Sequence, residues 1–287
     1  MPRVALATCA ALPHLDVEDA PLVAALRDAG IEGVPLVWND SSVAWATYDL
    51  VVVRTTWDYP NKIDPFLAWI DQVAAVRTLW NPAPLIRWNA DKTYLRALEL
   101  RGVPIVPTRW FRRGESADLR RLLEQEGWEE AVVKPVVSAG ARRTRLVRPD
   151  TVEEGAAFLA EQLTQRAMML QPYVAEVSSV GELSLLYFNG TFSHAVRKIP
   201  ASGDFRVQTE HGGRVLSVIP TAAEMAAGQR VLDAMPAETL YARVDLLPSG
   251  DGTFRLLELE VLEPSMFLTW DPAAPARFAA AIGVRLS

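Results

Sequence analysis

Three acidic residues near the end of the chain could form a metal site. In the segment RLLELEVLEP, residues 255–264, Glu258 and Glu260 alternate with leucine and valine. Alternation with a period of two predicts a β-strand with one apolar and one charged face. Asp245 lies on the preceding apolar run, and the turn at residues 249–252 predicts that the two runs pair as a hairpin. We therefore expect three carboxylates to converge on one spot.

Two interpretations of this carboxylate cluster follow from the residues alone. Ligation by oxygen with open positions suits Mg²⁺, which keeps water and phosphate oxygens as its remaining ligands. The alternative is the solvated polar face of an edge hairpin, where Arg243 and Arg255 make ordinary ion pairs. The strand alternation places Glu263 on the opposite face, so this residue is either structural or part of a substrate pocket.

The lysines provide a second signal, because only four of the 29 basic residues are lysine: Lys62, Lys92, Lys134 and Lys198. A composition so biased to arginine indicates that a remaining lysine is needed as a compact ammonium. Lys92 begins a helix, Lys134 ends an apolar strand, and Lys198 ends a strand before a polar loop that carries Arg206. We expect phosphate groups at these element ends, whereas Lys62 is expected on the surface.

Other classes of chemistry have little support in the sequence. The three histidines, His14, His194 and His211, are far apart and lack metal-ligand spacing. No serine-nucleophile, zinc-protease or Walker A motif is present. A net charge of −6 argues against general binding of nucleic acid, and no apolar run approaches the length of a membrane span.

The beginning of the chain could be mistaken for a signal peptide, because an arginine precedes a short apolar run. We interpret residues 4–8 instead as a buried first strand. Cys9 is the only cysteine, which excludes a disulfide within the chain and indicates a reducing cytoplasm.

The first third of the chain alternates strand and helix signals, which predicts a parallel α/β sheet. Strands are expected at residues 4–8, 34–38 and 50–54, and helices at 20–29 and 64–76. No dinucleotide fingerprint follows the first strand. Ligands bind at the carboxyl ends of such strands, so the loop of Thr55, Thr56, Trp57 and Asp58 is a candidate substrate site. Trp57 could equally be a loop anchor.

The middle and end of the chain are expected to mix helices with antiparallel strands. Residues 81–89 are predicted as a domain boundary, followed by a helix with Asn89 as its N-cap. Further helices are expected at residues 116–126, 151–163 and 220–234. Asn189-Gly190 predicts a two-residue hairpin turn, which would place Glu182 opposite Arg197 and direct Lys198 to the other face.

Seven segments occur in the order typical of ATP-grasp ligases: NADK, VVKP, LQPYV, GELSLL, GDFRVQTEHGG, YARVDLL and LLELEVLEP. Over residues 80–270 the chain resembles glutathione synthetase and the ribosomal-protein glutamate ligases, and more specifically the O-ureido-serine cyclo-ligases of cycloserine biosynthesis. The resemblance implies an α/β fold, α+β in its C-terminal part. It comprises an N-terminal parallel-sheet domain (1–87) and two ATP-grasp subdomains that clasp ATP (88–174 and 175–287).

The same resemblance implies a role for each matching residue. ATP would be held by Lys92 and Lys134 at its α- and β-phosphates, by a hinge of Gln171, Pro172, Tyr173 and Val174 at adenine, by Glu182 at ribose, and by Lys198 and Arg206 at the γ-phosphate. Asp245, Glu258 and Glu260 would bind Mg²⁺, two ions being expected and Mn²⁺ a substitute. Glu260 departs from the family pattern, which often has Asn there.

The implied function is that of an ATP-dependent carboxylate–amine ligase that forms a C–N bond through an acyl phosphate and releases ADP. Arg206, Arg243 and Lys198 would be catalytic, with Arg243 also on the substrate side. The substrate would be a small amino-acid-like carboxylate, closed into a ring as in the conversion of O-ureido-serine to cycloserine. Ligation of two molecules and a non-catalytic nucleotide-binding module remain alternatives. No nucleic acid or membrane partner is expected, and a homodimer remains open.

Overall fold

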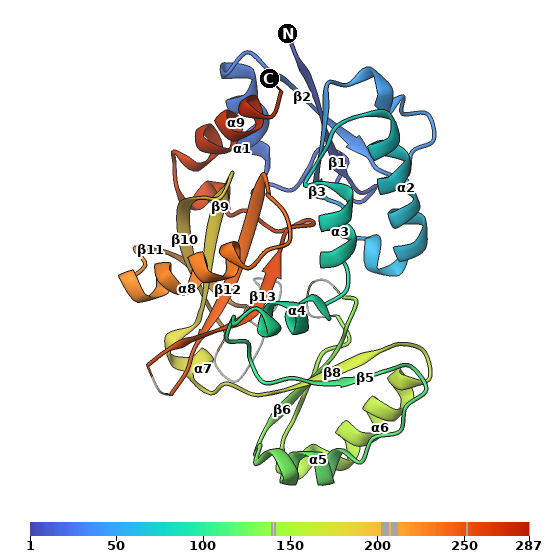
Figure 1. The fold of residues 1–287 in the computed structure, drawn as a ribbon, viewed down its shortest axis with the longest axis vertical. Helices are drawn as coiled ribbons and strands as arrows, with labels where there is room; N and C mark the ends of the chain where they lie inside the picture. The colour runs from blue at the N-terminus through green and yellow to red at the C-terminus, as the bar shows by residue number, and fades with distance from the viewer. Residues whose placement is uncertain (139, 141, 202–206, 208–211, 251, 287) are drawn as a thin grey trace.

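The computed structural model describes residues 1–138, 140, 142–201, 207, 212–250 and 252–286, and within them the chain forms three sheets (Figure 1). The expected α/β class is confirmed, with a parallel sheet first and antiparallel sheets after it. No helix in these ranges is both long enough and apolar enough to cross a membrane.

The N-terminal sheet is parallel and has the strand order β2-β1-β3-β4. Its elements are β1 (Arg3–Thr8), α1 (Ala20–Asp28), β2 (Glu32–Val37), β3 (Leu50–Thr55), α2 (Ile63–Val76) and β4 (Leu79–Trp80). All six residues of β3 are buried, as expected of a parallel strand covered on both faces. The predicted order of strands and helices is therefore confirmed here.

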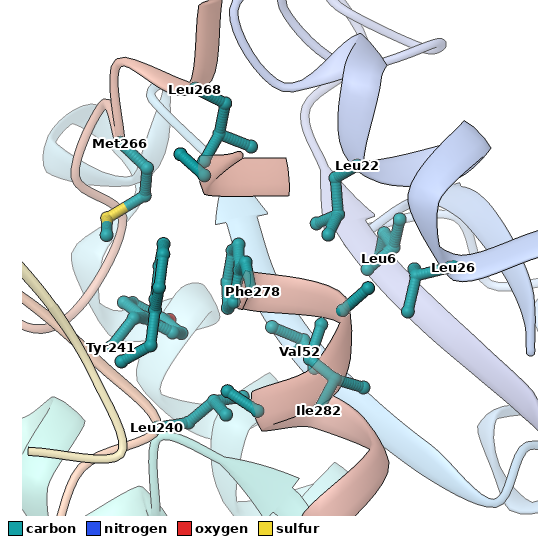
Figure 2. Packing of buried hydrophobic residues seen from close by; sticks show 14 of the residues in the cluster. Leu6, Leu22, Leu26, Val52, Leu240, Tyr241, Met266, Leu268, Phe278 and Ile282 are labelled. Atoms are coloured by element: carbon teal, nitrogen blue, oxygen red, sulfur yellow. The ribbon is translucent and has the colours of Figure 1, made fainter. Parts of the chain in front are cut away.

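The C-terminal helix α9 (Ala274–Val284) packs against this N-terminal sheet, which the sequence analysis did not anticipate. Phe278 and Ile282 lie one helical turn apart and share a buried cluster with Leu6, Leu22 and Val52 (Figure 2). The ring of Phe278 also stacks on Phe188, with centroids 4.5 Å apart. Both ends of the chain thus contribute to one core.

The segment between the first two sheets is helical, and one residue in it departs from expectation. The expected boundary is largely helix α3 (Ala83–Asn89), and the following helix α4 spans Tyr94–Leu100. Asn89 is not the N-cap of α4. Its amide instead donates to the Leu259 carbonyl at 2.7 Å and accepts from the Val261 N–H at 2.9 Å. Asn89 therefore binds the backbone of a segment far away in the chain instead of capping the helix.

The second sheet has the order β5-β8-β6-β7, and its helices α5 and α6 lie together beside it (Figure 1). Its elements are β5 (Arg109–Phe111), α5 (Leu119–Glu126), β6 (Ala131–Pro135), β7 (Arg145–Val147), α6 (Val152–Leu163) and β8 (Met168–Pro172). Asp118 caps α5 by accepting from the Arg121 N–H, and Gly127 ends the helix at φ +66°. This small sheet presents Lys134 and the expected hinge.

The third sheet is antiparallel and has the order β11-β10-β9-β12-β13. Its elements are α7 (Glu176–Val180), β9 (Glu182–Phe188), β10 (Thr191–Ile199), β11 (Arg214–Val218), α8 (Ala222–Asp233), β12 (Tyr241–Pro248) and β13 (Phe254–Glu260). Helix α8 approaches β9 so closely that a Cβ at Gly228 would lie 2.3 Å from the Tyr187 hydroxyl. A residue with a side chain larger than that of glycine would not fit at position 228.

The hairpin of β9 and β10 has the predicted turn but not the predicted register. Asn189 and Gly190 both adopt positive φ, as the turn requires. A bulge between Phe192 and His194 then adds one residue to β10, so that Lys198, not Arg197, lies opposite Glu182. The expected placement of Lys198 on the other face was therefore wrong.

The outer edge of β13 is covered by earlier parts of the chain. Leu256 pairs in both directions with the backbone around Ile105. Farther along, the Tyr94 hydroxyl accepts from the Leu259 N–H, and the Asn81 amide donates to the Val261 carbonyl at 2.6 Å. Together with Asn89, these contacts replace a neighbouring strand, so β13 is held from both sides.

Candidate active site

The hairpin of β12 and β13 brings the three predicted carboxylates together. Asp245 pairs with Glu258 across the hairpin, and Glu260 follows two residues later on the same face. One carboxylate oxygen of each lies within 4.8 Å of the others. An all-oxygen donor set of this kind suits a hard divalent cation such as Mg²⁺. The geometry therefore fits the metal, although it does not fix the number of ions.

Each of these carboxylates also has a cationic partner. Lys92 contacts Glu258 with its Nζ at 2.5 Å, and Arg243 contacts Glu260 at 2.5 Å and Asp245 at 3.0 Å. Lys198 lies 3.3 Å from Asp245. The cluster is thus an ion-pair network and not a solvated edge face, and its charges are largely balanced before any ligand binds.

The pKa values of the three carboxylates diverge although the groups are neighbours. Burial raises the pKa of Glu260 to about 7, and the like charges of Glu258 and Asp245 reinforce this against Arg243. Burial acts in the same direction on Asp245, but Arg243 and other cations overcome it and lower that pKa to about 2. For Glu258 the cations, led by Lys92, also prevail and lower the pKa. Asp245 and Glu258 are therefore the carboxylates most readily ionised.

Glu182 and Lys198 form a buried ion pair beside this cluster. Burial raises the pKa of Glu182 despite Lys198. Ser184, two residues along β9, donates its hydroxyl to Asp245 at 2.5 Å. Strand β9 therefore contributes two polar side chains, Glu182 and Ser184, to the site.

Lys134 approaches the same cluster from the second sheet. It pairs with Met169 in the ladder of β6 and β8, among apolar neighbours. Desolvation lowers its pKa to about 8, partly offset by the charge of Glu258. Within the described part of the chain its ammonium forms no hydrogen bond or ion pair. This lysine is therefore a cation without a fixed partner.

The predicted hinge lies at the end of β8. Gln171 is buried and donates to the Thr108 hydroxyl at 2.9 Å, and the Tyr173 N–H donates to the Glu130 carbonyl at 2.9 Å. A cavity of about 170 Å³ lies beside it, lined by Pro172, Tyr173 and Val174 together with residues at the end of β12, including Leu247. The hinge thus borders a space between two sheets.

The candidate substrate loop is anchored at several points. The Thr55 hydroxyl is hydrogen-bonded to the Thr8 hydroxyl at 2.6 Å. The Asp58 carboxylate accepts from the Trp38 indole N–H at 2.7 Å and from Lys62 at 2.8 Å. Both side chains therefore already have partners, and Lys62 is partly exposed, as expected.

The side chains of Trp57 and Thr56 differ in whether they have a hydrogen-bond partner. The indole N–H of Trp57 donates to the Glu263 carbonyl at 3.0 Å, which links the N-terminal loop to the segment after β13. The Thr56 hydroxyl is buried without a hydrogen-bond partner among the described atoms. Trp57 thus anchors the loop, and its role toward a substrate stays a prediction.

Glu263 is the residue that the sequence placed least well. The strand ends at Glu260, so the expected alternation does not extend to Glu263. Its side chain is only 6% exposed, and burial, followed by the charge of Glu260, raises its pKa to about 8. Burial, followed by the charge of Glu263, also raises the pKa of Tyr59, a residue that the sequence analysis missed. The signal that could have pointed to Tyr59 was the group of polar residues directly after Trp57.

The predicted site residues thus mostly come together. Those around the carboxylate cluster are Lys92, Lys134, Glu182, Lys198, Arg243, Asp245, Glu258 and Glu260. Arg206 lies outside the described residues. Their individual roles toward ATP and substrate stay predictions.

Comparison with known proteins supports the same picture. Residues 4–81 match the family described as the N-terminal domain of D-cycloserine synthetase DcsG, and residues 107–266 match the ATP-grasp domain of prokaryotic glutathione synthetase. A protein from Streptomyces lavendulae, named cycloserine biosynthesis protein DcsG, is 32% identical over 99% of this chain and 98% of its own length.

The fold of the chain also matches those of solved structures. The crystal structure of D-cycloserine synthetase DcsG superposes with a TM-score of 0.91 at 31% identity, covering 99% of this chain and all of the other. D-alanine–D-alanine ligase from Bacillus anthracis superposes with a TM-score of 0.70 at 14% identity, covering 100% of this chain and 97% of the other. The second similarity concerns the fold alone.

Proposed function

Because the chain belongs to the family of D-cycloserine synthetase DcsG within the ATP-grasp ligases, we propose that it closes an amino-acid derivative of the O-ureido-serine type into a ring. As a member of this family it is an ATP-dependent ligase that forms a C–N bond and acts on a small carboxylate. The observation that carries the cyclisation is the match over residues 4–81, because this domain lies outside the shared ATP-binding part.

The charge distribution supports the binding of ATP between the second and third sheets. Lys92 and Lys134 would neutralise the α- and β-phosphates as point charges, and Lys198 would meet the γ-phosphate. The adenine edge would meet the backbone of residues 171–174, beside the cavity of about 170 Å³. Glu182 would hold the ribose, sharing its present contact with Lys198.

Asp245, Glu258 and Glu260 would hold Mg²⁺, with two ions expected and Mn²⁺ as a substitute. When bound, the metal supplies a Lewis acid that neutralises phosphate oxygens. Binding at this cluster requires Glu260 to lose its proton, since its pKa is raised to about 7. Arg243 would then be free to turn from the carboxylates toward the substrate.

The reaction has two steps that balance without a covalent enzyme intermediate. The substrate carboxylate attacks the γ-phosphorus of ATP, which forms an acyl phosphate and releases ADP. A nitrogen of the same molecule then attacks the carbonyl carbon, the C–O bond to phosphate breaks, phosphate leaves, and the nitrogen loses a proton. With O-ureido-serine the ring nitrogen still carries the carbamoyl group, which water must remove as carbon dioxide and ammonia to give cycloserine. Arg243 and Lys198 would stabilise the developing negative charge, and a closed site would exclude water from the acyl phosphate.

The test supplies the purified protein with ATP, Mg²⁺ and O-ureido-serine as the single organic substrate, each enantiomer separately. We expect ADP release in step with a ring product detected by mass spectrometry. Release of ADP only when a second amine is added would establish ligation of two molecules instead. If no compound in a broad amino-acid panel stimulates ATP turnover, the chain is a nucleotide-binding module.

A further inference from the structure

Glu263 is a buried carboxylate that nothing described in this chain neutralises directly. The three carboxylates of the cluster pair with Lys92, Lys198 or Arg243. The Glu263 carboxylate, although only 6% exposed, makes no hydrogen bond or ion pair with any residue that the structure describes. Burial of an unpaired carboxylate is costly. A cation supplied by a ligand would remove this cost.

The backbone around Glu263 is fixed by an unusual series of contacts. Four consecutive carbonyls, from residues 262 to 265, each accept a hydrogen bond from a side chain. The donors are the Tyr241 hydroxyl (2.7 Å), the Trp57 indole (3.0 Å), the Arg54 guanidinium (3.0 Å) and the Arg243 guanidinium (3.3 Å), in chain order of the acceptors. These hydrogen bonds hold the backbone of the segment in place, so the point from which the Glu263 side chain extends is preorganised.

Two of these donors come from the N-terminal domain, and they fix where Glu263 lies. Arg54 is fully buried in an ion pair with Asp19, at 2.8 Å, and spends a further N–H on the Pro264 carbonyl. Trp57 belongs to the candidate substrate loop. The Glu263 backbone is therefore bonded to that loop, and its carboxylate is close enough to Glu260 of the carboxylate cluster for the two charges to interact.

Further polar atoms beside Glu263 are also unused. Among the described atoms, the Thr56 hydroxyl and one terminal nitrogen of Arg54 are buried without any hydrogen-bond partner. Both belong to residues next to Trp57 or bonded to Pro264. These atoms are independent of the carboxylate cluster, and they indicate that the wall formed by the two segments is incomplete without a ligand.

A metal ion does not account for Glu263. Among the described residues, the carboxylates close enough to share an ion are Asp245, Glu258 and Glu260. Glu263 does not belong to this group. The nearby cations are also engaged elsewhere: Arg54 with Asp19, Lys92 with Glu258, and Arg243 with Asp245 and Glu260. An ionised Glu263 can therefore gain a cation from the molecule whose carboxylate reacts at the cluster.

We propose that Glu263 binds the ammonium group of the amino-acid substrate and thereby positions the neighbouring carboxylate for phosphorylation. This assignment rests on the proposed function, since it requires the substrate to carry an ammonium group one carbon from the reacting carboxylate. A charge-assisted hydrogen bond from ammonium to Glu263 pairs both charges at once. Glu263 is then a specificity-determining residue that selects amino acids over simple acids.

The experiment compares two substrates in two enzymes. The substrates are O-ureido-serine and 3-(ureidooxy)propanoic acid, which has hydrogen in place of the ammonium group. We expect the wild-type protein to prefer the amino acid by about 10²–10³-fold in kcat/KM, because a site built for a polar group rejects an analogue that lacks it. In Glu263→Gln this preference is expected to fall to about tenfold or less, mainly through a higher KM, because a neutral amide cannot pair the ammonium charge.

Controls separate this role from others. Glu263→Asp keeps the charge and should retain most of the preference, and Glu124→Gln, an exposed glutamate on α5, should match the wild type. The KM for ATP and the Mg²⁺ dependence should not change in Glu263→Gln. An altered Mg²⁺ dependence would make Glu263 a metal ligand, and equal loss of kcat for both substrates would make it a proton acceptor. Either result overturns the proposal.

The proposal can fail separately from the proposed function. If O-ureido-serine is inactive, the amino acid that stimulates ADP release replaces it, together with its own analogue lacking the ammonium group. If Glu263→Gln does not fold, the wild-type preference and the Glu263→Asp variant carry the test. A wild-type protein that does not discriminate between the paired substrates overturns the role of Glu263, as does a panel in which no amino acid is turned over.

Discussion

The two walls of the candidate site carry lysines in opposite circumstances. On the wall built by the start of α4 and by β13, Lys92 contacts Glu258 at 2.5 Å. The negative charge of Glu258 raises the pKa of Lys92, although burial acts to lower it. On the wall built by β6, Lys134 has no fixed partner in the described chain, and desolvation lowers its pKa to about 8. One wall is balanced within the protein, and the other is completed only by an anionic ligand.

This difference separates stability from binding. A lysine that is already paired contributes to the folded state and to the ligand, whereas an unpaired lysine costs stability and contributes to the ligand alone. The same reasoning distinguishes Glu258, which serves the metal and Lys92, from Ser184, which serves only a carboxylate. Substitutions on the two walls should therefore have different signatures.

The largest effect is expected for Glu258→Gln, which breaks the balanced wall. Loss of one metal-binding charge should lower kcat by about 10³-fold or more, because charge stabilisation at transferring phosphoryl groups is worth several kcal/mol. Turnover is measured at saturating ATP over a Mg²⁺ titration, with circular dichroism to establish that the fold is intact. Activity close to that of the wild type at saturating Mg²⁺ would refute the metal assignment.

A paired comparison of Lys134→Met and Lys92→Met sharpens the contrast directly. Both should weaken ATP binding by about 10–100-fold, since each removes a charged phosphate contact. Only Lys92→Met should lower stability, by about 1–2 kcal/mol, because it leaves Glu258 without its cation. Calorimetry measures the affinity, and denaturant unfolding measures the stability. Unchanged ATP affinity in Lys134→Met would reject its phosphate role, and equal destabilisation of both variants would remove the distinction between the walls.

A smaller effect is expected from pH, through Lys134 alone. Its pKa in the folded protein, about 8, lies below the ordinary value of 10.5. Between these values the unfolded chain binds more protons, so this group makes stability rise with pH. ATP requires the ammonium form, so affinity should fall as pH rises through 8, to about one tenth at pH 9. Calorimetric titrations at pH 7 and 9 measure this fall, which should vanish in Lys134→Arg because guanidinium stays charged.

The smallest effect is expected for Ser184→Ala, which removes one neutral donor from the balanced wall. The hydroxyl lies 2.5 Å from Asp245, and both residues are buried. Loss of this hydrogen bond should lower stability by about 1 kcal/mol and reduce turnover only slightly. Urea unfolding provides the measurement, with exposed Ser179→Ala as the control. A loss of turnover as large as that of Glu258→Gln would contradict the division between ligand and supporting residue.

Local patterns were sufficient to predict the hairpin of β12 and β13. Alternation and a short turn predicted that Asp245, Glu258 and Glu260 converge, and the structure confirms this, although the hairpin also has a bulge between Asp245 and Leu246. The hairpin of β9 and β10 shows the limit of that reasoning. Its turn was correct, but the bulge between Phe192 and His194 moved Lys198 onto Glu182. A single extra residue changes every later pairing, and the sequence carries no clear signal for it.

Residues whose partners are far away in the chain were the least predictable. Asn89 has the position of a helix cap but bonds β13, about 170 residues later. Glu263 continues an alternating pattern beyond the end of its strand and is instead placed by donors from the N-terminal loop. Helix α9 joins residues of both the first and the third sheet in one core. In each case a tertiary contact overrides a local preference.

The covered edge of β13 has a consequence for how the protein is assembled. An open edge strand is a template for aggregation, and here Asn81, Asn89 and Tyr94 block it. All three precede residues 254–260 in the chain, so they are synthesised and can fold first. Glu258 and Glu260 reach their places only when this last strand docks. A molecule in which β13 has not yet docked therefore lacks the metal site and is inactive. The residues that cover the edge of β13 belong to the same chain, so docking within the chain is favoured over pairing with another molecule.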